Sequence, residues 1–229
     1  MNVLNDFISL IFPCVCEACG DGLQKHEEVI CTICDYNLPK TDFHLDKNNP
    51  VAQLFNGRTN INSASAFYLF NKDGKVQQLI HELKYKGKKH IAHFIGTRYG
   101  IELKNSPDFN TISTIIAVPL HSEKLKRRGY NQSEYFAKGL AESMNAKTDF
   151  TSLIRITANT SQTKKSRYER WKNVEFVFQL KETTALEGKH VLLVDDVVTT
   201  GATLEACAQV LHQIKNVRIS IVTIAYANL

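Results

Sequence analysis

Apolar residues along the chain fall into short segments whose spacing switches between that of a strand and that of a helix. Between Val76 and Leu83 they recur at helical spacing, which predicts an amphipathic helix. The short apolar runs at residues 114–118 and 191–194 instead predict strands that are buried on both faces of a sheet. This alternation is typical of an α/β domain with a mostly parallel sheet flanked by helices.

The remaining segments follow the same two periodicities. Strands are expected at residues 64–70, 114–118, 174–180, 191–194 and 217–225. Helices are expected at residues 76–85, 90–103, 133–144 and 201–214, with a polar loop after residue 118. The apolar residues before Phe12 predict one further short helix that packs on the protein.

The predicted division of the chain follows from where the regular pattern begins. Residues 1–45 contain a cluster of cysteines. Residues 46–60 carry few apolar side chains and a turn signal at Asn56 and Gly57, as a linker would. The regular alternation occupies residues 61–229. We therefore expect a small N-terminal module with its own short helix, a linker and one α/β domain.

Composition narrows the class of protein. Hydrophobic residues make up 43% of the 229 residues, enough for a buried core, which argues against wholesale disorder. The N-terminal stretch contains Asp6 and lacks a basic leader, and no apolar segment reaches the ~20 residues that a bilayer-spanning helix needs. We therefore expect a cytoplasmic protein with no membrane partner. The formal net charge of +5 favours anionic partners.

Two Cys-x-x-Cys pairs lie near the N-terminus, Cys16 with Cys19 and Cys31 with Cys34. Clustered cysteines in a cytoplasmic chain point to a metal ion rather than to disulfides, and four thiolates at about 2.3 Å complete a tetrahedral zinc site. Cys14 could replace Cys16 as a ligand, at a poorer spacing. Structural zinc would hold together a module too small to fold on its own core. Direct contact of this module with nucleic acid or a protein partner is the other interpretation.

Two adjacent carboxylates follow the apolar run 191–194, at the carboxyl end of a predicted strand, where open α/β sheets bind ligands. Backbone N–H groups of the following loop and helix N-terminus suit an anion, and Gly201 permits its close approach. Because the acids would repel an anion, we expect them to face neutral hydroxyl groups or a cation beside it. The alternative is a pair of acids capping an ordinary turn. The candidate sugar-phosphate residues are Asp195, Asp196, Val198, Thr199, Thr200, Gly201, Ala202 and Thr203.

Two basic segments accompany this candidate site. The first follows strand 114–118 and suits a second anion, for which pyrophosphate is the natural candidate; a solvated surface turn is the alternative. The second, residues 155–173, is long enough to close over a charged ligand as a lid, or is a surface loop without a role. The cluster from Lys84 to His90 is interpreted as a solvated helix end or as part of a basic track. The candidate pyrophosphate and lid residues are His121, Lys124, Arg127, Arg128, Asn131, Gln132, Gln162, Arg167 and Arg170.

These motifs resemble those of known proteins. The stretch from Val191 to Thr203 resembles the phosphoribosyl pyrophosphate (PRPP) motif of type I phosphoribosyltransferases. Nearly the whole chain resembles the ComF (GntX, or ComFC-type) competence proteins, with the extra Cys14 as the departure. The segments that carry this second resemblance are Leu83-Lys84-Tyr85-Lys86-Gly87, Pro119-Leu120-His121, Arg127-Arg128-Gly129-Tyr130-Asn131-Gln132, the spaced residues from Arg155 to Phe176, and the four-cysteine module.

The resemblance implies a type I phosphoribosyltransferase fold with a small N-terminal four-cysteine zinc finger. It also implies that Asp195 and Asp196 hold the ribose hydroxyls of PRPP, that the Thr199 to Thr203 loop holds its 5′-phosphate, and that Mg²⁺ bridges pyrophosphate and ribose oxygens. The catalytic residues implied in this way are Asp195, Asp196, Arg127 and Arg128.

Three functional hypotheses follow. The chain could be a phosphoribosyltransferase, that is, a glycosyltransferase that moves a pentosyl group from PRPP to an unknown acceptor. It could instead be a non-catalytic module of DNA uptake that binds single-stranded DNA or a competence helicase through its basic clusters. Finally, it could be a regulator that senses a sugar phosphate without turnover, since a fold does not fix a function.

Overall fold

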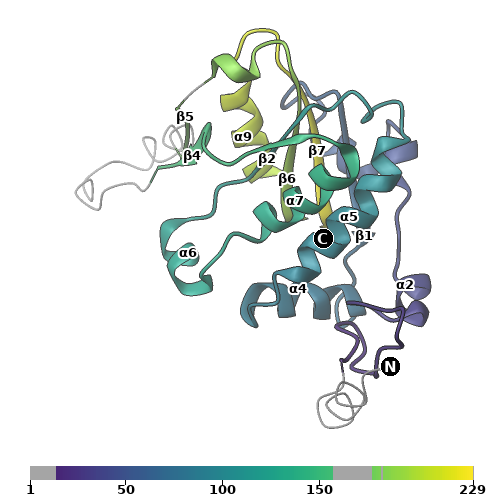
Figure 1. Cartoon of the computed structure of the whole chain (residues 1–229). Coiled ribbons are helices and arrows are strands. Elements are labelled where there is room, and N and C mark those ends of the chain that lie inside the picture. The colour runs from purple at the N-terminus through teal and green to yellow at the C-terminus, as the bar shows by residue number, and fades with distance from the viewer. Residues whose placement is uncertain (1–13, 157–176, 182, 229) are drawn as a thin grey trace.

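The computed structural model describes residues 14–156, 177–181 and 183–228. At its centre lies a five-stranded parallel sheet with the strand order β1-β7-β6-β2-β3 (Figure 1). Its strands are β1 (Ser63–Leu69), β2 (Thr114–Ala117), β3 (Lys147–Asp149), β6 (His190–Val198) and β7 (Arg218–Tyr226). A separate antiparallel pair is formed by β4 (Leu153–Arg155) and β5 (Phe178–Leu180).

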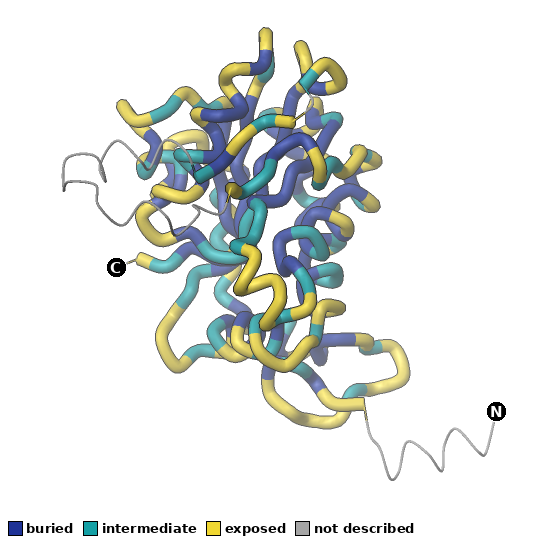
Figure 2. Tube along the Cα trace, turned by 90° about the vertical axis from the view of Figure 1, so that its left-hand side faces the viewer, coloured by how far each residue is buried: buried dark blue, intermediate teal, exposed yellow. Residues whose placement is uncertain are grey.

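Helices cover both faces of the sheet, because successive strand residues point to opposite faces and are apolar on each of them. Leu192 and Val194 of β6 pack in the layer of α4 (Lys75–Tyr85), α5 (His90–Lys104) and α7 (Gln132–Met144). Their neighbours in β6 pack in the opposite layer with α3 (Pro50–Gln53) and α9 (Ala202–Leu211). Figure 2 shows the buried positions concentrated along the sheet and the inner sides of these helices.

The helices α5 and α7 approach each other closely because glycines line their contact. A Cβ on Gly139 would lie 2.1 Å from the carbonyl oxygen of His93, and a Cβ on Gly96 would lie 2.3 Å from that of Phe136. Any side chain there would force the two backbones apart. This contact fixes the position of α7, whose first turn contains the candidate site residue Gln132.

The predicted fold class is confirmed, with differences at the ends of elements. Strand β6 continues through the acidic pair to Val198, beyond the predicted end at residue 194. The predicted loop after β2 contains a helix, α6 (Ser122–Arg128), which begins at His121 as N-cap and ends at Gly129 with φ 77°. The expected N-terminal helix and residues 174–176 of the expected strand 174–180 lie outside the described residues.

The stretch between the cysteine module and β1 packs into the protein. It contains η1 (Phe43–Leu45) and α3. Asn49 is 1% exposed and donates to the carbonyl oxygens of Phe43, Asp46 and Ala64, while Val51 is fully buried. These residues therefore join the core. The domain boundaries themselves stay a prediction.

The cysteine module (residues 14–38), with its helix α2 (Thr32–Asn37), packs against the layer of α4 and α5. Its buried residues Ile30 and Leu38 belong to the same apolar cluster as Leu79 of α4. Among the residues that the structure describes, no helix has the length and apolar character needed to cross a bilayer.

Candidate functional site

The acidic pair lies where the connections from two neighbouring strands diverge. From β2 the chain runs through α6 and α7 to β3, whereas from β6 it runs through α9 to β7. Because α7 and α9 cover opposite faces, the carboxyl ends of β2 and β6 form a topological switch point, and the space beyond them is called the crevice here. This is the position at which doubly wound sheets bind ligands.

Asp195 points toward the first turn of α7. Its Oδ1 accepts a hydrogen bond from the Ser133 hydroxyl at 2.9 Å and from the Asp196 backbone N–H at 2.8 Å. Burial, followed by the charge of Asp196, raises the pKa of Asp195 to about 7. A carboxyl group with such a pKa can take up or release a proton near neutral pH.

Asp196 points toward α4. Its Oδ2 lies 2.9 Å from the ammonium nitrogen of Lys84, and both side chains are largely shielded from solvent. Lys88 pairs with Glu82 and with Glu17 of the cysteine module. The interpretation of residues 84–90 as a solvated helix end is therefore wrong for Lys84 and Lys88, because each is held by carboxylates from the folded core.

The loop after β6 forms a small cleft of about 70 Å³ lined by Asp195 and residues 197–204. Gly201 adopts a left-handed conformation, with φ 75°, and caps α9. The backbone N–H groups of Thr199 to Thr203 donate no hydrogen bond to any acceptor among the described residues. A loop with several unpaired N–H groups at a helix N-terminus suits an anion.

The basic segment after β2 presents its charges on α6. Lys124 and Arg127 are exposed, and the Nδ1 atom of His121 caps the helix by accepting from the Glu123 N–H at 3.3 Å. Arg128 donates to Oε1 of Gln132 at 2.9 Å. Within the described part of the chain, the buried Arg128 Nε and Gln132 Nε2 have no acceptor. Two unpaired buried donors beside the crevice suit an anionic ligand.

Asn131 has a role in holding this segment. It is 4% exposed, donates to the Val118 carbonyl oxygen at 3.0 Å and accepts from the Ser133 N–H at the start of α7. The hydroxyl of Tyr130 donates to the Leu83 carbonyl oxygen, which ties the segment to α4. The candidate lid residues Gln162, Arg167 and Arg170 lie outside the described residues.

The four cysteines predicted to bind metal come together. The Sγ atoms of Cys16, Cys19, Cys31 and Cys34 lie within 4.8 Å of one another, so this cluster could hold a metal ion such as zinc. The Cys31 N–H donates to the sulfur of Cys16 at 3.2 Å. Although burial acts to raise it, the backbone N–H of Cys31 and its neighbours lower the pKa of Cys16 to about 7. Cys14 is exposed and lies outside this cluster.

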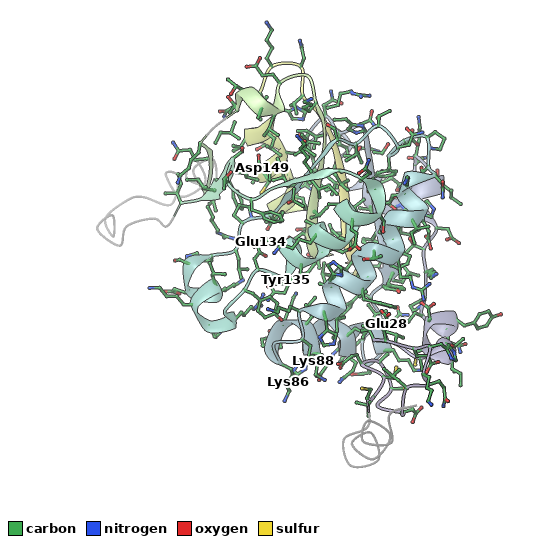
Figure 3. The ribbon with its side chains drawn as sticks, viewed as in Figure 1. Glu28, Lys86, Lys88, Glu134, Tyr135 and Asp149 are labelled. Carbon is green, nitrogen blue, oxygen red and sulfur yellow. The ribbon has the colours of Figure 1, made fainter. Side chains whose placement is uncertain are left out.

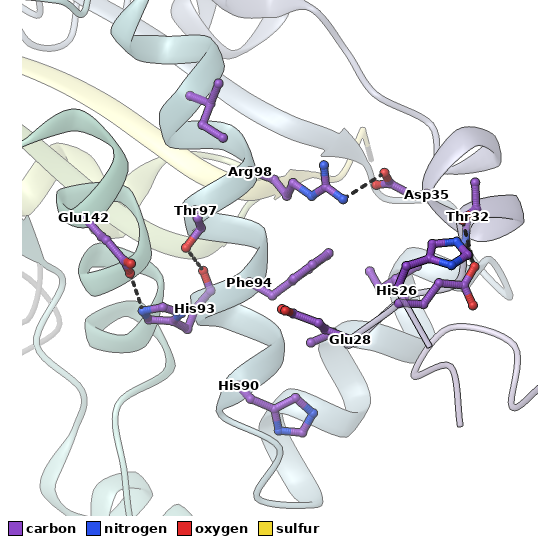
Figure 4. A pocket seen from close by; sticks show the side chains of 14 residues that line it. His26, Glu28, Thr32, Asp35, His90, His93, Phe94, Thr97, Arg98 and Glu142 are labelled. Carbon is purple, nitrogen blue, oxygen red and sulfur yellow. Dashed lines mark hydrogen bonds and ion pairs between the residues drawn. The ribbon is translucent and has the colours of Figure 1, made fainter. Parts of the chain in front are cut away.

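A larger cleft, of about 680 Å³, lies away from the crevice, between the cysteine module and α5 (Figure 4). Its visible ion pairs join Arg98 to Asp35 at 3.6 Å and His93 to Glu142 at 3.2 Å. Cleft size alone therefore does not select the candidate site, and the converging polar groups at the end of β6 favour that position instead.

Sequence reasoning missed two contacts of the acidic pair, those from Ser133 and Lys84. Both residues are far from Asp195 and Asp196 in the sequence, and the pairing depends on how α4 and α7 cross the sheet. The resemblance of the segment Leu83 to Gly87 to a family motif was the available signal for Lys84.

One family model and one solved structure are similar to part of the chain. The family model described as "Phosphoribosyl transferase domain" matches residues 131–228. These contain β6, the acidic pair and the candidate phosphate loop from Thr199 to Thr203, called the phosphate loop below. The solved structure of glutamine PRPP amidotransferase from B. subtilis is 19% identical, covering 62% of this chain and 30% of that chain with a TM-score of 0.42. Residues 131–228 are thus similar to a phosphoribosyltransferase domain, and the described sheet with its flanking helices has the fold of this class.

Two curated relatives are also similar to this chain. "DNA utilization protein YhgH" of Escherichia coli O6:H1 is 32% identical over 139 residues, which are 59% of this chain and 60% of that protein. "Competence protein ComFC" of Bacillus subtilis is 28% identical over 204 residues, which are 86% of this chain and 77% of that protein. The chain is therefore similar to ComF-type proteins over most of its length, and its described fold is of the phosphoribosyltransferase type.

Proposed function

We propose that this chain binds the ribose 5-phosphate part of PRPP, together with Mg²⁺, in the crevice at the end of β6. The observation that carries the proposal is the pairing of two carboxylates with a loop of unpaired N–H groups at one strand end. The N–H groups suit the 5′-phosphate. The carboxylates of Asp195 and Asp196 suit ribose hydroxyls and a hard cation, because carboxylate oxygens are preferred ligands of Mg²⁺.

The unpaired donors of Arg128 and Gln132 support pyrophosphate near the start of α7, where Ser133 contacts Asp195. Mg²⁺, when bound, would neutralise charge that develops on the leaving pyrophosphate. In a transfer reaction the bond between the anomeric carbon and the pyrophosphate oxygen breaks. The acceptor forms a new bond to that carbon, and pyrophosphate leaves. Arg127 and Arg128 would then stabilise the departing charge.

Isothermal titration with PRPP and Mg²⁺ tests the proposal. The Asp195→Asn/Asp196→Asn variant should lose binding while its thermal unfolding stays cooperative. Asp73→Asn is the matched control, because its carboxylate is exposed and its left-handed backbone, φ 61°, also accepts asparagine. Normal binding by the double variant, or none by the wild type, would refute the assignment.

The relatives named for competence and DNA utilization support a role in DNA uptake. A specific observation favours direct DNA contact as a second candidate function. Lys124, Lys126 and Arg127 are exposed on α6, and none pairs with an acid among the described residues. Such a row of free cations beside an anion site suits a polynucleotide backbone.

Fluorescence anisotropy of a labelled oligothymidine at several salt concentrations tests this second function. Replacing Lys124, Lys126 and Arg127 with alanine should reduce the slope of log affinity against log salt by about 2, if each cation contacts one phosphate. The same change at the exposed lysines 104, 147 and 215 is the control. An unchanged slope in the α6 variant would exclude α6 from the DNA contact.

A further inference from the structure

The segment from Leu54 to Ile61 supports the phosphate loop from the side of α9. The ring of Phe55 lies so close to Gly201 that a Cβ on the glycine would approach its Cε1 atom to 3.1 Å. Phe55 itself is 1% exposed and belongs to the core. The phosphate loop therefore packs at Gly201 against a buried side chain of the core.

Arg58 makes three contacts, of which one is with the phosphate loop. Its Nη1 donates to the Thr200 carbonyl oxygen at 2.8 Å and to the Leu54 carbonyl oxygen at 2.9 Å. Its Nη2 pairs with the carboxylate of Glu205 in the first turn of α9. One planar guanidinium thus joins two loops and a helix.

The contact with Thr200 determines how the next peptide group is oriented. In a trans peptide the C=O and N–H bonds point in opposite directions, so a carbonyl held by Arg58 turns the following N–H away from Arg58. That N–H belongs to Gly201, and it is one of the unpaired donors of the phosphate loop. Without Arg58, the Thr200–Gly201 peptide could rotate, since glycine tolerates many backbone conformations.

We propose that Arg58 is a positioning residue that orients the Thr200–Gly201 peptide for phosphate binding. This inference rests on the proposed function of the loop. Glu205 completes the device, because an unpaired carboxylate in the first turn of α9 would oppose an anion at the same helix end. Arg58 neutralises that carboxylate while it holds the carbonyl.

The test uses the full, zinc-loaded chain and ribose 5-phosphate as the probe. Nuclear magnetic resonance of ¹⁵N-labelled protein reports on affinity and on the Gly201 N–H in one titration. Arg58→Ala should weaken ribose 5-phosphate binding about 10- to 100-fold, as expected when hydrogen bonds linked to a charged group are lost. The ligand-induced shift of the Gly201 N–H should shrink in the same variant, even at saturating ligand.

Two further variants separate orientation from charge. Glu205→Gln removes the ion pair and leaves the contacts of Arg58 with Thr200 and Leu54, so it should bind ribose 5-phosphate at least as tightly as the wild type. Arg98→Ala is the matched control, because Arg98 is also a partly exposed arginine paired with an acid but lies on α5. Added guanidinium should restore part of the binding of Arg58→Ala.

The outcomes distinguish this inference from the function on which it rests. If the wild type does not bind ribose 5-phosphate, the proposed function fails at its first step. If the wild type binds and Arg58→Ala retains both the affinity and the Gly201 shift, the positioning role is wrong. Loss of binding equally in Arg98→Ala would show a general effect of arginine removal and would also overturn the assignment.

Discussion

The ammonium nitrogen of Lys84 lies 2.9 Å from Oδ2 of Asp196, which joins α4 to the carboxyl end of β6. The pair is partly shielded from water, with side-chain exposures of 21% and 13%. It supplies a fixed positive charge to a strand end where two carboxylates are adjacent. The acidic pair is therefore partly neutralised by the protein itself before any ligand or cation arrives.

Replacing Lys84 with methionine should lower the free energy of unfolding by about 1–3 kcal/mol, between the values for exposed and for buried ion pairs. The physical reason is that Asp196 is left beside Asp195 without its cation. In an Asp196→Asn background the same replacement should cost less than half as much. Urea unfolding of the four proteins of this cycle measures the coupling.

Lys86→Met is the control for that cycle, because Lys86 is exposed and its charge acts on Glu82 and not on the Asp195–Asp196 pair. Its side chain extends from the end of α4 (Figure 3). Equal effects of Lys84→Met in both backgrounds would contradict the assigned ion pair.

The high pKa of Asp195 predicts a distinctive dependence of stability on pH. The group's pKa rises from its ordinary 3.8 to about 7 in the folded protein. The folded chain therefore binds more protons than the unfolded chain in this range, and its stability should fall as the pH rises from about 4 to about 7. Asp195→Asn should remove this contribution and be more stable than the wild type at pH 8, by roughly 1–3 kcal/mol.

Chemical denaturation of the wild type and of Asp195→Asn, at several values between about pH 4.5 and about pH 8, measures the difference in their free energies of unfolding. The asparagine can still accept from Ser133, so the hydrogen bond to α7 is kept. A wild type whose stability relative to Asp195→Asn does not change with pH would show that Asp195 titrates at its ordinary pKa.

The sequence carries enough information to find the core of the site but not its neighbours. The apolar run before Asp195 and the small residues after Asp196 are contiguous, so local physics predicts a strand, a turn and an anion site together. Lys84 and Ser133 reach the same point only through tertiary packing. No periodicity in the sequence encodes a contact of that kind.

The loop predicted after β2 was wrong at residues 122–128, where the structure has the helix α6. The helix α6 has no buried residue, so the apolar periodicity that signals a helix is missing. The polar stretch around Asn49 resembles a linker in composition, yet Asn49 satisfies three carbonyl oxygens inside the fold. A buried polar side chain with all its partners cannot be told from a solvated one by composition.

The arrangement of the cysteines predicts which of them hold the metal. Cys34→Ser should abolish stoichiometric zinc binding and destabilise the module, because the remaining three thiols cannot complete a closed tetrahedral site. Cys14→Ser should retain one zinc per chain, since Cys14 lies outside the cluster. Metal content after dialysis and the thermal midpoint with and without a chelator are the measurements. Zinc loss in Cys14→Ser would instead assign Cys14 as a ligand.

Alanine should destabilise the protein to different extents at Gly201 and at Gly129, two glycines that both have a left-handed backbone. Gly201 has φ 75° and Gly129 has φ 77°, so alanine is strained at both, by about 1–2 kcal/mol. At Gly201 the new Cβ also meets the ring of Phe55 at 3.1 Å, whereas at Gly129 no heavy atom lies within 4 Å. Gly201→Ala should therefore destabilise the protein more than Gly129→Ala and should also displace the phosphate loop. Urea unfolding and ribose 5-phosphate titration of the two variants measure both effects, and equal losses of stability would show that Phe55 yields without cost.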